Sequence, residues 1–113
     1  MLKLCRVDIS RSQELFKAID NYRDKLVREL KPERIILFGS FARGDINEGS
    51  DVDLIVIADW QQDFLDRIKI LMDLNDRRLP IEPIGYTPDE FKRMRKEGNP
   101  FIEEVEATGK IIY

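Results

Sequence analysis

The strongest constraint on the fold is the short separation between two strand-like segments, residues 34–38 and residues 51–58. The linker between them, residues 39–50, is rich in Gly, Asp, Asn and Ser, which are turn-forming residue types. Parallel neighbours in a sheet need a long crossover connection, usually a helix, and this linker is too short for one. We therefore expect the two segments to pair as antiparallel strands, with the turn after Phe38 beside the start of the second strand.

The remaining segments complete an α/β pattern. Amphipathic helices are predicted over residues 13–30, 61–76, 88–97 and 99–107, and a further strand over residues 79–86. Residues 110–113 are either a small final strand or a docked tail. Thr87 and Glu90 have the spacing of a capping box, and Pro83 places its strand at an edge or a bulge because proline cannot donate to a ladder. This order predicts one α/β domain, residues 1–113, with a small mixed β-sheet packed with amphipathic helices.

The composition narrows the function. The 113 residues carry a formal net charge of −3, which argues against general nucleic-acid binding, because that needs clustered Lys and Arg. No apolar run is long enough to span a bilayer, so we expect no membrane association. The lone Cys5 and the lack of a start typical of a signal peptide favour a cytoplasmic location. The chain has no histidine, so its chemistry would rest on carboxylates and a metal.

Two aspartates, Asp51 and Asp53, begin the second strand of the pair. Side chains two residues apart on a strand project to the same face, so both carboxylates would point toward one spot. Mg²⁺ is a hard cation that proteins hold through one or two carboxylates, with substrate phosphates and water completing the coordination. The pair predicts a magnesium site, and the alternative is a polar hairpin with two solvated acids.

The turn before these aspartates is suited to phosphate. Gly39 lets the backbone turn sharply and lets a phosphate approach without a Cβ in the way, and Ser40 adds a hydroxyl group. Arg43 would neutralise phosphate charge, or it is a surface arginine paired with an acidic residue of the linker. Ser50, at the end of the linker, either caps the turn or contacts the nucleotide.

These features together resemble the signature of the DNA polymerase β-like nucleotidyltransferase superfamily: Gly-Ser, ten intervening residues, and then Asp-x-Asp flanked by apolar residues. The strings Gly-Ser-Phe-Ala-Arg-Gly and Ser-Asp-Val-Asp-Leu-Ile-Val are similar to those of its stand-alone minimal nucleotidyltransferases. By element order the resemblance covers about residues 13–95, and its specific part is residues 38–56. It implies the polymerase β-like fold and transfer of a nucleoside monophosphate, usually AMP from ATP, to a hydroxyl with release of pyrophosphate.

The resemblance also implies residue roles. Gly39 and Ser40 would hold the triphosphate, and Asp51 and Asp53 would ligate two metal ions, Mg²⁺ or alternatively Mn²⁺. A third carboxylate on the next strand of such enzymes ligates one metal and helps to activate the acceptor hydroxyl, and Glu82 stands at the matching position.

Glu82 departs from the family pattern, which usually shows aspartate in an uninterrupted strand. Because glutamate is longer and Pro83 follows it, Glu82 is either a ligand with shifted geometry or a solvated edge residue.

The resemblance further implies partners. Minimal members of the family are often encoded beside a small helical HEPN-type protein and act as antitoxins, some by adenylylating a tyrosine of that partner. ATP or another nucleoside triphosphate is then the substrate, and the expected protein partner is a HEPN-type helical protein, with a homo-oligomer as the other form of association. An alternative stays open, in which a catalytically weak or inactive antitoxin neutralises a HEPN-type ribonuclease by binding alone. The basic run in residues 88–97 is either a solvated helix face or a contact for a partner or RNA.

Overall fold

A mixed sheet with the strand order β3-β2-β1-β4 organises the structure, a computed structural model that describes residues 9–39, 42 and 52–113. The elements are α1 (Ile9–Leu30), β1 (Arg34–Phe38), β2 (Val52–Ile57), α3 (Phe64–Asp73), β3 (Ile81–Tyr86), α4 (Pro88–Lys96), α5 (Pro100–Thr108) and β4 (Lys110–Ile111). β1 pairs antiparallel with β2 and with β4, and β2 pairs parallel with β3. The predicted α/β class, the mixed sheet and the antiparallel pairing of the first two strands are confirmed.

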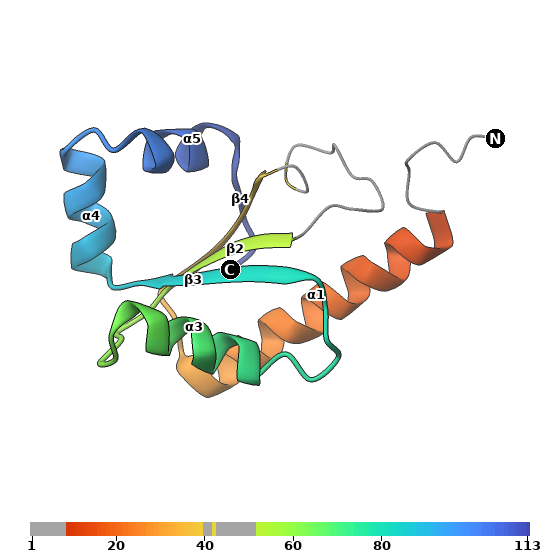
Figure 1. Cartoon of the computed structure of the whole chain (residues 1–113). Helices are drawn as coiled ribbons and strands as arrows, with labels where there is room; N and C mark the ends of the chain where they lie inside the picture. The colour runs from red at the N-terminus through yellow and green to blue at the C-terminus, as the bar shows by residue number, and fades with distance from the viewer. Residues whose placement is uncertain (1–8, 40–41, 43–51) are drawn as a thin grey trace.

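Helices cover both faces of the sheet (Figure 1). One core cluster joins α1 and α3 to the sheet and contains Leu26, Leu54 and Leu71. A second cluster joins α4 and α5 to the opposite face and contains Ile55 and Phe91. Successive side chains of β2 therefore enter different clusters, and the strand is buried on both faces. Among the helices in the described ranges, none has the length and apolarity needed to cross a membrane.

Local side chains set the start of α4 and α5. The predicted capping box is present, because the Thr87 hydroxyl accepts from the Glu90 amide and the Glu90 carboxylate accepts from the Thr87 amide. The Asn99 side chain caps α5 by accepting from the amides of Phe101 and Ile102. Both helices thus begin where the sequence predicts.

The two longer helices differ from their predicted ranges. α1 begins at Ile9 rather than at residue 13, because residues 9–12 contain no glycine or proline that would stop it. α3 is shorter at both ends than residues 61–76, because Asp63 has an extended backbone and the Asn75 side chain bonds to the backbone of Leu79. The segment between Asp73 and β3 is therefore a structured turn.

Pro83 lies on the outer edge of the sheet and leaves the ladder of β3 intact. The carbonyl oxygens of Pro80 and Tyr86 accept hydrogen bonds from the amides of Val52 and Ala58. Because hydrogen-bonding directions alternate along a strand, Pro83 turns its nitrogen away from β2. The predicted edge position is confirmed, and the register with β2 runs unbroken along β3.

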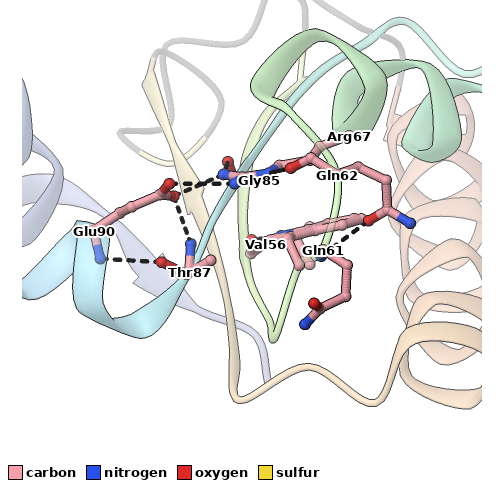
Figure 2. A network of polar contacts seen from close by, with 8 residues as sticks. Val56, Gln61, Gln62, Arg67, Gly85, Thr87 and Glu90 are labelled. Atoms are coloured by element: carbon pink, nitrogen blue, oxygen red, sulfur yellow. Dashed lines mark hydrogen bonds and ion pairs between the residues drawn. The ribbon is translucent and has the colours of Figure 1, made fainter.

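Arg67, on α3, makes hydrogen bonds to the edge strand β3 and to α4 (Figure 2). From α3, its guanidinium donates to the two Glu90 carboxylate oxygens at 2.6 and 3.2 Å and to the Gly85 carbonyl at 3.2 Å. Its Nε donates to the Gln62 carbonyl at 2.6 Å. The Arg67 side chain is only 9% exposed, so these acceptors replace the water that the cation loses on burial.

Trp60 packs against the same end of β3. Its indole N–H donates to the Val56 carbonyl at 3.2 Å, and the side chain is buried. A Cβ at Gly85 would lie 2.8 Å from the indole, closer than side-chain carbons pack. Glycine at this strand position is therefore what admits the indole.

Acid should weaken the fold through Glu90. Hydrogen bonding from Arg67 is the main cause that holds the pKa of the Glu90 carboxyl below its usual value of 4.5. The unfolded chain binds this proton more readily, so the stabilisation is complete above pH 4.5 and is lost as the pH falls through the lower folded pKa. Urea denaturation across this range should show the loss.

Glu90→Gln should flatten this acid dependence and destabilise the protein at neutral pH by about 1–2 kcal/mol, because Arg67 then stays buried without a counter-charge. Glu104→Gln is the matched control, since Glu104 is exposed and makes no ion pair with the residues described. A Glu90→Gln variant with the stability and pH profile of the wild type would show that the ion pair does not stabilise the fold.

Candidate active site

Three strand ends bring Gly39, Asp53 and Glu82 together. Phe38 lies opposite Asp53 in the β1–β2 pairing, and Gly39 directly follows Phe38. Asp53 lies beside Glu82 in the β2–β3 pairing. Residues that are distant in the sequence therefore meet at one end of the sheet, with Asp53 in the middle.

Asp53 and Glu82 project from the face of the sheet that α4 and α5 cover further along the strands. Asp53 and Ile55 are two residues apart on β2, so their side chains point to the same face, and Ile55 belongs to the core cluster on that face. Glu82 is the register partner of Asp53 on β3 and therefore projects from the same face. Asp53 is half-buried, whereas Glu82 is exposed. The acidic end of this face thus opens to solvent at Glu82, where another molecule can reach it.

Gly39 fits closely against Asp53. Its backbone has φ +78°, and a Cβ at this position would lie 2.2 Å from the Asp53 Oδ2 atom. The left-handed conformation and the near carboxylate each require glycine. The space that the missing Cβ leaves is thus occupied by the Asp53 carboxylate, and the predicted role of Gly39 in admitting a phosphate stays a prediction.

Four further residues predicted for the site, Ser40, Arg43, Ser50 and Asp51, lie outside the described residues. Their contacts with nucleotide or metal stay predictions. The described chain on either side of them ends at Gly39 and begins again at Val52, with the buried Ala42 between.

The donor set at this end fits a hard divalent cation. Asp53 and Glu82 offer carboxylate oxygens from adjacent strands and one face, which suits Mg²⁺ or Mn²⁺. Within the described ranges, no three His, Cys, Asp or Glu residues form a cluster that could hold a metal. A third carboxylate would therefore come from outside these ranges, where the sequence predicts Asp51 as the ligand.

A cavity of about 320 Å³ lies at the other end of β3, between α3 and α4. Phe64, Tyr86 and Arg93 are among its lining residues, and no sequence motif connects them. Burial, aided by the charge of Glu90, raises the pKa of the Tyr86 hydroxyl, which therefore stays protonated. Since Tyr86 and Glu82 are at opposite ends of β3, this cavity is separate from the acidic site.

Known proteins resemble this chain along most of its length. Residues 20–113 match the model of the family described as Polymerase beta, Nucleotidyltransferase. The chain is 33% identical over 98 residues to putative protein adenylyltransferase MJ0141 of Methanocaldococcus jannaschii, which covers 85% of the chain and 96% of that protein. It is 36% identical over 109 residues to putative protein adenylyltransferase MJ1305 of the same organism, with 86% and 73% covered.

One solved structure shares the fold. The crystal structure of a putative nucleotidyltransferase from Sulfolobus solfataricus matches this chain with a TM-score of 0.60 and 22% sequence identity. The match covers 75% of this chain and 78% of the other. The arrangement of sheet and helices is therefore a nucleotidyltransferase fold.

Gly39→Ala should displace the Asp53 carboxylate, because the new methyl group and Oδ2 would overlap. We expect a loss of about 2–4 kcal/mol in unfolding free energy, of which about 1–2 kcal/mol comes from the left-handed backbone. In an Asp53→Ala background the overlap is absent, so only the backbone cost should remain. Urea denaturation of the four proteins of this double-mutant cycle measures the difference.

Gly98→Ala is the matched control, because Gly98 also has a positive φ of +72° but its Cβ would lie 3.9 Å from the nearest atom. The unfolding free energy lost on Gly98→Ala should be the same in the wild-type and the Asp53→Ala backgrounds. If Gly39→Ala also costs the same with and without the Asp53 side chain, the close contact does not constrain residue 39.

Proposed function

The chain belongs to the polymerase beta nucleotidyltransferase family, and on that premise we propose that it transfers AMP from ATP to a hydroxyl group on a protein. The observation that carries the proposal is the placement of Asp53 beside Glu82, on one face of the sheet and next to Gly39. The two M. jannaschii relatives named as protein adenylyltransferases support AMP as the transferred group and protein as the acceptor.

The proposed reaction is an in-line displacement at the α-phosphorus of ATP. The acceptor oxygen forms the new bond to phosphorus, the bond from phosphorus to the bridging oxygen breaks, and pyrophosphate leaves with that bonding pair. Glu82 takes the proton of the acceptor hydroxyl on a carboxylate oxygen, a role that suits its exposure to solvent.

The other residues bind and orient the nucleotide. Gly39 lets the turn pack against the Asp53 carboxylate, and Ser40 and Arg43 hold the triphosphate. The carboxylates of Asp51, Asp53 and Glu82 would hold two Mg²⁺ ions. When bound, these ions stabilise the charge on the attacking and leaving oxygens.

Pro83 bears on the alternative of an antitoxin that acts by binding alone. That alternative rests in part on the departure of Glu82 and Pro83 from the family pattern. Because Pro83 faces the outer edge and the β2–β3 register is unbroken, Glu82 keeps its position beside Asp53. This favours the catalytic proposal, with a HEPN-type helical protein as the candidate acceptor.

Asp53→Asn should reduce transfer of label from α-labelled ATP to below about 1% of the wild-type rate while the fold is kept. Glu82→Gln should lower the rate by about a hundredfold or more if Glu82 takes the proton. Chelation of divalent cations by EDTA should have the same effect as Asp53→Asn. The assay uses the purified protein with a co-expressed HEPN-type chain and follows label on either protein.

Asp59→Asn provides the control, since Asp59 is an exposed carboxylate just beyond the opposite end of β2. Its rate should equal that of the wild type. Undiminished transfer by a folded Asp53→Asn protein would rule out the proposed catalytic site. Toxin neutralisation that survives in Asp51→Asn/Asp53→Asn would instead support action by binding alone.

A further inference from the structure

A basic pocket of about 190 Å³ lies between α1 and the turn that joins α3 to β3. Lys25 and Arg28 reach it from α1, and Arg77 reaches it from the turn. The three cations come together in a chain whose net charge is −3. We call this surface the basic pocket, defined by Lys25, Arg28 and Arg77.

Two of the three charges have no counter-ion in the described part of the chain. Lys25 forms an ion pair with Asp76, which also lines the pocket. Arg28 and Arg77 are exposed and make no ion pair with other described residues. The pocket therefore carries uncompensated positive charge that an anionic group can neutralise.

The turn that presents Arg77 is fixed by the Asn75 side chain. The Asn75 amide nitrogen donates to the Leu79 carbonyl, and its oxygen accepts from the Leu79 amide, both at 2.9 Å. On the other wall, the hydroxyl of the buried Tyr22 donates to the Leu71 carbonyl at 2.6 Å and joins α1 to α3. Both walls of the pocket are thus anchored before any ligand binds.

The turn leads directly into the candidate active site. The carbonyl of Pro80 accepts from the amide of Val52, which precedes Asp53. Arg77 and Glu82 are five residues apart, so the chain between them spans at most about 18 Å. The pocket lies on the α1 and α3 side of the sheet and Glu82 projects from the other side, so a peptide that joins them would pass around the edge strand β3.

We propose that the basic pocket docks an acidic segment of the protein that accepts AMP. This inference rests on the proposed function, because it takes the acceptor to be a protein. Carboxylates of the acceptor pair with Arg28 and Arg77, and its hydroxyl group, a few residues away, reaches Glu82. The pocket thus selects acceptors in which Asp or Glu residues lie near the modified hydroxyl.

The shape of the pocket favours a peptide over a nucleic acid. The three cations converge on one small cavity, whereas a nucleic-acid strand is held by a row of cations that follows its phosphates. A short carboxylate side chain fills a cavity of this kind with a bidentate arginine contact. RNA is therefore the competing ligand that the test must include.

Fluorescence anisotropy can test docking without any turnover. The probe is a labelled peptide in which glutamates flank one tyrosine, and the reference peptide has glutamine in place of each glutamate. The wild type should bind the acidic peptide about tenfold more tightly than the reference, and Arg28→Gln/Arg77→Gln should remove that preference. Lys92→Gln/Lys96→Gln on α4 removes the same charge from exposed positions and should keep it.

A charge-reversal variant distinguishes loss of the docking site from misfolding of the first variant. Arg28→Glu/Arg77→Glu should prefer a peptide with lysine in place of glutamate, which a misfolded protein would not do. An equal loss of preference in the α4 control, or no preference in the wild type, would overturn the proposal. So would tighter binding of a single-stranded RNA through Arg28 and Arg77.

Transfer from α-labelled ATP separates this inference from the proposed function. Acidic-peptide binding through Arg28 and Arg77 without any transfer would contradict the adenylyltransferase proposal and leave the docking site in place. Transfer to a protein acceptor at the same KM in wild type and Arg28→Gln/Arg77→Gln would contradict the docking proposal alone. The expected result is a KM for that acceptor raised about tenfold with kcat unchanged.

Discussion

The double pairing of β2 is the constraint on which the rest of the structure depends. β2 is antiparallel to β1 and parallel to β3, so Asp53 is fixed between the end of one neighbour and the start of the other. A slip of one residue would turn Asp53 toward α1 and α3 and would bury a carboxylate in an apolar cluster. Val52 and Leu54, which are almost fully buried on that side, oppose the slip. Apolar packing on both faces of one strand thus sets the position of Asp53.

The two ends of β3 differ in the residues they bring together. At its carboxyl end, the Arg67–Glu90 ion pair neutralises a buried cation and the Trp60 indole packs closely on Gly85, and both contacts stabilise the fold. At its amino end, Glu82 lies beside Asp53 on the neighbouring strand, so two carboxylates share one face of the sheet. Two carboxylates placed in this way are typical of a site that binds a hard divalent cation.

Local signals in the sequence account for much of the fold. The short linker predicts the β1–β2 pairing, Thr87 and Glu90 predict the start of α4, and the spacing of the motif predicts that Gly39 and Asp53 meet. Contacts between distant segments could not be predicted in this way. The partner of Glu90 is Arg67, 23 residues away, and the direction of Pro83 depends on a register that no local pattern specifies. The basic pocket likewise depends on contacts between distant segments, since its ion pair joins Lys25 and Asp76, which are 51 residues apart.

The exposure of Glu82 links catalysis to recognition. Phosphoryl-type transfer gains from exclusion of water, which strengthens each electrostatic contact and prevents water from acting as the acceptor. In this structure Glu82 faces solvent, so water reaches the acidic end of the sheet when no acceptor is bound. A protein acceptor that covers this end would exclude the water and deliver its hydroxyl in one step. Docking at a nearby surface then raises the affinity for such an acceptor, and the bound acceptor completes the environment in which the carboxylates would act.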